Sequence, residues 1–138
     1  MTPKEFLQQA FVAHKEIEIR LEQITNLRAL ATQTTTVIKT VPGGSNIFRS
    51  RIENAVILIQ EHAAHLADEV TRLIEITKEI SSAIALVPNA NERAILEYRY
   101  LCFFSWQQIS ALMKTSVENL FKIHRRAIKN FREYSKVQ

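Results

Sequence analysis

Residues 91–134 read NERAILEYRYLCFFSWQQISALMKTSVENLFKIHRRAIKNFREY, and this stretch decides the fold of the C-terminal part of the chain. Apolar side chains recur at helical spacing in three runs, which two short breaks separate, the second at Lys114. Ser105 precedes the second run and is a favourable N-cap residue. Thr115 precedes the third run and fits a capping box with Glu118. The apolar positions are Ile95, Leu96 and Leu101 in the first run, Trp106, Ile109 and Leu112 in the second, and Leu120, Ile123, Ala127 and Phe131 in the third.

A short helix, a tight turn and a longer basic helix form a helix-turn-helix, whose second helix enters the DNA major groove. The charge distribution points the same way. Residues 91–138 contain nine Lys/Arg and four Asp/Glu, a net charge of +5, whereas residues 1–90 contain nine Lys/Arg and ten Asp/Glu, a net charge of −1. A basic cluster alone fits a solvated surface equally well. Its coincidence with a helix-turn-helix favours nucleic-acid binding, with double-stranded DNA as the partner.

The candidate DNA-binding residues lie in the third helix and directly before it. The first turns of a recognition helix meet base edges, and basic residues along its polar side meet phosphates. The predicted set is Ser116, Val117, Glu118, Asn119, Phe121, Lys122, Arg125, Arg126, Lys129 and Arg132.

Four of these residues have chemically specific expectations. Asn119 could pair with adenine, and Lys122 could reach guanine. Glu118 either belongs to the capping box or accepts from a cytosine amino group. Phe121 either contacts a thymine methyl group or packs against the leading helix or the N-terminal half. His124, nearby, either contacts phosphate or packs at the domain surface.

The composition predicts an all-α protein, because 138 residues contain only two Gly and three Pro. The single cysteine, Cys102, lies beside Leu101 and Phe103 and is expected to be a buried structural thiol. No apolar run approaches the roughly 18 residues that span a bilayer, and no signal peptide is visible. These features predict a soluble cytoplasmic protein without membrane contact.

The N-terminal part is predicted to be a long antiparallel helical hairpin covering residues 1–90. Thr2 as N-cap, Pro3 at N1 and Glu5 at N3 signal the first helix. Threonines lower helix propensity after Ala31, so residues 32–49 are expected to form an irregular loop with a turn at Pro42–Asn46. The second helix is expected to begin near Ser50 and to end before Pro88–Asn91, which marks the domain boundary with residues 91–138.

The second helix carries a heptad repeat. Its positions seven apart are Ile52, Ile59, Leu66, Leu73, Ile80 and Val87, and the intervening stripe is Val56, Ala63, Val70, Thr77 and Ile84. An apolar stripe of this length requires a partner, which is the first helix, a second copy of the chain, or both. The first helix is too short to cover it fully. The repeat therefore predicts a homo-oligomer formed through residues 1–90.

The C-terminal stretch resembles region 4 of sigma-70-type sigma factors. The matching positions are Arg93, Leu96, Arg99 and Tyr100 in the leading helix, Gln108 and Ile109 in the second, and Ser116, Glu118, Leu120, Ile123 and Arg126–Ile128 in the third. The third helix has Val117, Asn119 and Phe121 where promoter-reading sigma factors tend to carry arginines. The resemblance therefore implies the fold and not recognition of the −35 element.

The whole chain also resembles small phage and prophage regulators of the RinA and ArpU late-operon activator type. The segments that carry this resemblance are Leu96–Leu101, Trp106–Ile109 and Phe121–His124. It implies a sequence-specific DNA-binding transcription regulator that activates phage or prophage late genes in the cytoplasm of a bacterial host cell. Two alternatives remain open. One is a sigma-like module that contacts RNA polymerase directly, and the other is a DNA-packaging protein of the small terminase kind.

Catalysis and metal binding are not expected. No glycine-rich phosphate loop, paired-carboxylate site or Ser/Cys–His nucleophile pattern is present, so the sequence predicts neither an enzyme nor a cofactor. His62 and His65 lie one helical turn apart beside Glu61 and Glu69, but two histidines without a third ligand are expected to face solvent rather than hold a metal.

Overall fold

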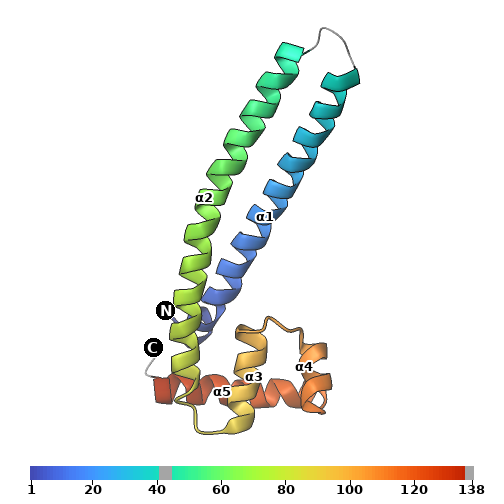
Figure 1. Ribbon diagram of the computed structural model, residues 1–138. Coiled ribbons are helices and arrows are strands. Elements are labelled where there is room, and N and C mark those ends of the chain that lie inside the picture. The colour runs from blue at the N-terminus through green and yellow to red at the C-terminus, as the bar shows by residue number, and fades with distance from the viewer. Residues whose placement is uncertain (41–44, 136–138) are drawn as a thin grey trace. The chain divides into compact units, whose positions relative to one another are not determined.

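The structure, a computed structural model, describes residues 1–40 and 45–135, and in these ranges the chain forms five α-helices and no strand. The helices are α1 (Pro3–Thr40), α2 (Ser45–Ile84), α3 (Ala90–Tyr100), α4 (Trp106–Met113) and α5 (Val117–Ser135) (Figure 1). The predicted all-α class is confirmed. Among the described residues, no helix combines the length and the apolar character needed to cross a bilayer.

Helix α1 begins with the predicted capping box. The Glu5 backbone N–H donates to Thr2 Oγ1 at 3.2 Å, and the Thr2 backbone N–H donates to Glu5 Oε2 at 3.1 Å. Pro3 follows the cap as the first helical residue, where its missing N–H costs no hydrogen bond. The start of the chain is thus fixed by local side-chain chemistry that the sequence displays.

The irregular loop predicted for residues 32–49 is wrong over most of its length. Helix α1 continues to Thr40, and α2 begins at Ser45 instead of Ser50. The threonines are accommodated because their hydroxyls donate to carbonyls one turn earlier, Thr34 to Leu30 O at 2.8 Å and Thr35 to Ala31 O at 2.9 Å. Their propensity cost of about 0.5 kcal/mol per residue does not stop a helix that is already long. The remainder of the predicted turn, residues 41–44, lies outside the described residues.

The chain divides into two compact units. One, termed the core unit, consists of Met1–His14 and Arg72–Gln138. The other, termed the paired-helix unit, consists of Lys15–Thr71. This division differs from the boundary predicted at residue 90, because the ends of α1 and α2 share a hydrophobic core with α3, α4 and α5.

The core unit buries apolar residues from all five helices around one centre. Its fully buried large side chains are Leu7 of α1, Ile80 and Ile84 of α2, Val87 of the connection between α2 and α3, Ile95 and Leu96 of α3, Ile109 of α4, and Leu120 and Phe131 of α5. Helix α5 lies across α3 and also contacts α4 (Figure 1). The apolar runs of the C-terminal stretch therefore meet in this core.

The paired-helix unit consists of antiparallel stretches of α1 and α2 (Figure 1). Ile17 and Ile24 of α1 are buried between them. Arg20 Nε donates to Glu69 Oε1, and Arg20 Nη1 lies 2.8 Å from His62 Nδ1. His62 is thus half-buried and hydrogen-bonded, contrary to the expectation that it faces solvent.

Helix α1 is longer than predicted, yet it covers only part of the heptad stripe of α2 in this unit. Ile52, Ile59 and Leu66 are half-buried, whereas Val56 is 43% exposed and Val70 is 39% exposed. His65 is exposed, and the described residues contain no cluster of three or more His, Cys, Asp or Glu side chains arranged to hold a metal ion.

The prediction of a buried thiol at Cys102 is wrong. Helix α3 ends at Tyr100, and the backbone N–H groups of Leu101 and Cys102 both donate to Glu97 O at 3.0 Å. This turn takes Cys102 out of the helical register that would have buried it, and its side chain is exposed. Phe103 follows with φ 61, in the left-handed region, which redirects the chain towards α4.

Candidate nucleic-acid interface

Helix α4 begins at the predicted cap. Ser105 Oγ accepts from the Gln108 backbone N–H at 3.2 Å, and Gln108 Oε1 accepts from the Ser105 backbone N–H at 2.8 Å. The helix ends at the predicted break, where Lys114 adopts φ 55 and ψ 46 in the left-handed region. Ser110 Oγ donates to Thr115 O, which ties the last turn of α4 to the connection with α5. A three-residue turn, residues 114–116, therefore joins α4 to α5.

The capping box predicted between Thr115 and Glu118 is wrong by one residue. The N-cap is Ser116, whose Oγ accepts from the Asn119 backbone N–H at 3.1 Å. Thr115 Oγ1 instead accepts from Asn119 Nδ2 at 2.7 Å. The error arises because the left-handed residue before Thr115 lengthens the turn, so that the first helical residue is Val117.

This correction changes which predicted site residues are available to a ligand. Glu118 is exposed, and its side-chain carboxylate makes no hydrogen bond or ion pair with any residue between 1 and 40 or between 45 and 135. Asn119 is exposed, but its side-chain amide is already bound to Thr115. Val117 is half-buried, and Ser116 is engaged as the cap. Of the first-turn residues, Glu118 is therefore the one whose polar side chain makes no hydrogen bond within residues 1–40 and 45–135.

Four predicted basic residues form a stripe along α5. Lys122, Arg125, Lys129 and Arg132 are all exposed and recur at three- and four-residue steps, opposite the fully buried Leu120. None of them forms an ion pair within the described parts of the chain. The stripe runs for about 15 Å, and its positive charge makes this face of α5 attractive to a polyanion.

Arg126 lies on the flank of this stripe, beside the start of α3. It lines a polar cavity of about 200 Å³ together with Asn89, Asn91, Glu92, Asn119 and Ile123. Glu92 is 6% exposed and accepts from Asn130 Nδ2 at 2.7 Å, which holds the first turn of α3 against α5. Sequence reasoning assigned Asn89 and Asn91 only to a domain boundary. The signal that could have placed Asn89 is its N-cap position, since its Oδ1 accepts from the Glu92 backbone N–H.

Phe121 packs on α4 while remaining 43% exposed. Its ring meets that of Trp106 edge to face, with centroids 5.2 Å apart. Trp106 also carries the Arg99 guanidinium 4.6 Å from its ring centroid. The predicted packing of Phe121 thus occurs, but its partner is α4 and not the leading helix or the N-terminal half.

His124 belongs to the same cluster and is not a phosphate ligand in this arrangement. Its Nε2 lies 2.7 Å from Tyr100 Oη, and its ring meets Trp106 edge to face at 5.0 Å. Burial, and then the positive charges of Lys4 and Arg99, lower its pKa to about 4. Burial raises the pKa of Tyr100 to about 12, an effect that Arg99 opposes. Both side chains are therefore neutral near pH 7, and the hydrogen bond fixes α5 on α3.

Comparisons with known proteins do not identify a relative: no protein-family model, curated protein or solved structure matches the chain.

Proposed function

We propose that α4 and α5 form a DNA-binding helix-turn-helix, and that the protein is a sequence-specific transcription regulator. The observation that carries this proposal is the basic stripe of Lys122, Arg125, Lys129 and Arg132, which lies exposed and without ion-pair partners in the described ranges, directly after a three-residue turn. In a helix-turn-helix the second helix enters the major groove, and basic side chains along it contact phosphates.

The contacts of the first turns refine which residues read bases. Glu118 and Lys122 are exposed and have no partner among the described residues, so we expect them to contribute most of the base contacts. Asn119 would have to exchange its bond with Thr115 for one with adenine. Phe121 is exposed enough to touch a thymine methyl group without leaving Trp106.

The resemblance to late-operon regulators makes activation of phage or prophage late genes the specific form of this proposal. Two other outcomes are distinguishable by experiment. Binding to RNA polymerase that does not require DNA would favour a sigma-like module. A large ring-shaped oligomer that binds a packaging sequence would favour a terminase-like role. Mapping the genomic binding sites separates both from promoter binding.

The direct test replaces two of the basic residues on α5. The double change Arg125→Ala, Arg126→Ala should weaken DNA binding on specific and scrambled duplexes alike. The slope of log affinity against log salt should fall by about 1.8, because each lost phosphate contact contributes about 0.9. Fluorescence anisotropy across a salt series measures both quantities.

A matched control removes the same charge elsewhere in the core unit. Arg72 and Lys78 are exposed residues of α2, and the double change Arg72→Ala, Lys78→Ala should leave affinity and salt slope nearly unchanged. Unchanged affinity of the Arg125→Ala, Arg126→Ala protein at physiological salt would sink the proposal. Equal losses in both proteins would mean that net charge, and not α5, attracts the DNA.

A further inference from the structure

Two grooves run between α1 and α2 in the paired-helix unit, with volumes of about 420 and 340 Å³. The larger groove lies at residues 16–23 and 65–69, and the smaller lies at residues 27–34 and 51–58. The α1 side chains that line them continue from one groove into the next in the order Glu16, Arg20, Gln23, Leu27, Leu30 and Thr34. Steps of three and four residues keep side chains on one face of a helix. The two grooves therefore open on the same face, one after the other.

The two ends of the paired-helix unit have opposite net charge. In the distal half, residues 24–40 and 45–60, four basic side chains stand against one acidic side chain, a net charge of +3. In the proximal half, residues 15–23 and 61–71, two basic side chains stand against six acidic ones, a net charge of −4. The paired-helix unit is thus electrically polar along its length.

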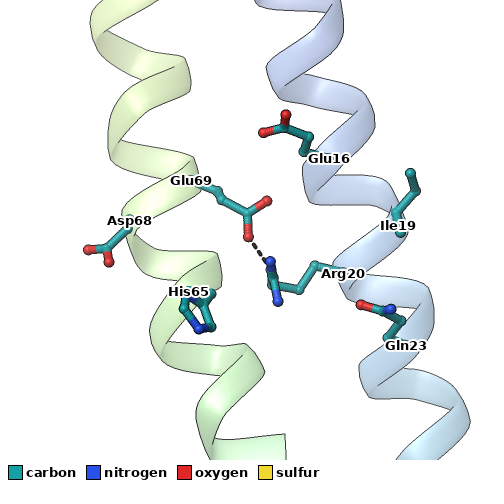
Figure 2. A pocket seen from close by; sticks show the side chains of 7 residues that line it. All are labelled: Glu16, Ile19, Arg20, Gln23, His65, Asp68 and Glu69. Carbon is teal, nitrogen blue, oxygen red and sulfur yellow. Dashed lines mark hydrogen bonds and ion pairs between the residues drawn. The ribbon is translucent and has the colours of Figure 1, made fainter.

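The same polarity is present in the grooves themselves. Figure 2 shows the Glu16 carboxylate directed from α1 towards the space beside α2, whereas the Glu69 carboxylate accepts a hydrogen bond from Arg20 Nε. The distal groove carries Arg51, which is exposed and whose guanidinium lies 5.6 Å from the Phe48 ring centroid. The side chains that line the proximal groove, which include Glu16 and Asp68, thus have a net charge of −2, and those that line the distal groove have a net charge of +1 from Arg51.

Apolar side chains on this face lack cover. Ile19 in the proximal groove is 59% exposed, and Leu30 and Leu58 in the distal groove are 57% and 44% exposed. The unit is about 40 Å long, and two packed helices are about 20 Å wide, so the face measures about 800 Å². That is the area which each partner contributes to an interface of standard size.

We infer that this face binds a second copy of the chain in the antiparallel direction, so that the distal groove of each copy meets the proximal groove of the other. Ile19 of one copy then packs on Leu30 and Leu58 of its partner, and Arg51 approaches Glu16. A parallel arrangement would instead place Arg51 against Arg51 and Glu16 against Glu16, and like charges oppose association. None of the residues that line the grooves belongs to the heptad repeat, so this face is a different surface for self-association from the one that the repeat predicts. The inference does not depend on the proposed DNA binding.

The oligomeric state of the 138-residue protein tests whether this face mediates self-association. Sedimentation equilibrium should show a dimer, and Leu58→Glu should weaken it by more than about tenfold, because the partner would bury an unpaired carboxylate. Ile57→Glu is the matched control: Ile57 is 52% exposed on the same helix, but it lines neither groove, and its change should leave the dissociation constant within about threefold. A monomeric wild-type protein at high micromolar concentration, or equal effects of the two changes, overturns the inference.

Exchange of the charges at Arg51 and Glu16 tests whether the two copies pair in the antiparallel direction. Arg51→Glu and Glu16→Lys should each weaken the dimer by about tenfold, and the double variant should restore it to within about threefold of the wild type. Far-ultraviolet circular dichroism and melting temperature confirm that each variant folds. Additive losses in the double variant would contradict the antiparallel pairing.

Cross-linking gives a second, independent measure of direction in a Cys102→Ser background. Mixed Ile19→Cys and Leu30→Cys proteins should form the mixed disulfide in preference to either symmetric one. Preferential Ile19→Cys or Leu30→Cys homodimers would show a parallel arrangement and overturn the inference. DNA affinity enters none of these measurements, so a failure here leaves the proposed function standing.

Discussion

Helix α2 carries one heptad repeat through two different environments. In the core unit, Ile80 and Ile84 are completely buried, because α1 and the C-terminal helices cover both sides of the stripe. In the paired-helix unit, Val56 and Val70 remain 43% and 39% exposed, because α1 covers only one side. The repeat shows which residues require burial, but the number of helices around them decides how much burial they obtain. The two units should therefore respond differently to the same substitution.

The largest expected difference concerns truncation of isoleucine in α2. Ile80→Ala should lower the free energy of unfolding by about 2–5 kcal/mol, because it leaves a cavity in a closed core. Ile57→Ala in the paired-helix unit should cost less than about 1 kcal/mol, because that side chain is already 52% exposed. Urea unfolding followed by circular dichroism and by Trp106 fluorescence measures both. Equal losses of unfolding free energy in the two variants would contradict the difference in packing between the two units.

The features of the fold that sequence could predict are those fixed locally. The caps at Thr2 and Ser105 and the break at Lys114 depend on a few adjacent residues, and each was predicted correctly. The loop at residues 32–49 was predicted wrongly because propensity was weighed without the threonine hydroxyls that bond back into α1. The compact units depend on contacts between the two ends of the chain, which no periodicity displays.

The candidate site likewise has some features that the sequence could predict and others that it could not. The exposed basic stripe of α5 was predictable, because helical spacing alone places Lys122, Arg125 and Lys129 opposite Leu120. The roles of Asn119 and His124 were not, because each depends on its partner. Asn119 contacts Thr115 because the turn has three residues, and His124 is half-buried because Tyr100 of α3 and Trp106 of α4 pack against it. Contacts between elements decide which polar groups remain for a ligand.

The next prediction, of intermediate size, concerns the loss of stability of the core unit at acid pH. The pKa of His124 is about 4 in the folded core unit and about 6.5 in an unfolded chain, so between these values the unfolded state binds more protons. The contribution of neutral His124 to the free energy of unfolding is therefore complete above pH 6.5 and is lost as the pH falls towards 4. After allowance for solvent screening, we expect a loss of about 1.5 kcal/mol between pH 7 and pH 5.

The control for this loss is His124→Gln, which keeps a polar side chain but does not titrate. The Trp106-detected unfolding free energy of the variant should depend less on pH across this window. Trp106 lies directly beside the imidazole, with ring centroids 5.0 Å apart, and therefore reports on the core unit. An unchanged pH dependence in His124→Gln would assign the acid sensitivity to other groups.

The smallest expected effect on stability concerns single hydroxyl groups in the two units. In the paired-helix unit Thr35 bonds back into its own helix, whereas in the core unit the Ser116 hydroxyl satisfies a backbone N–H that has no helical partner. Ser116→Ala should therefore cost about 1 kcal/mol. Thr115→Ala should cost only a few tenths of a kcal/mol, because it removes one exposed side-chain bond to Asn119. Thermal unfolding of the two variants decides which residue caps α5. If Thr115→Ala were the more damaging change, the turn would have two residues, Glu118 would return to the capping box, and the base contact expected of Glu118 would lose its basis.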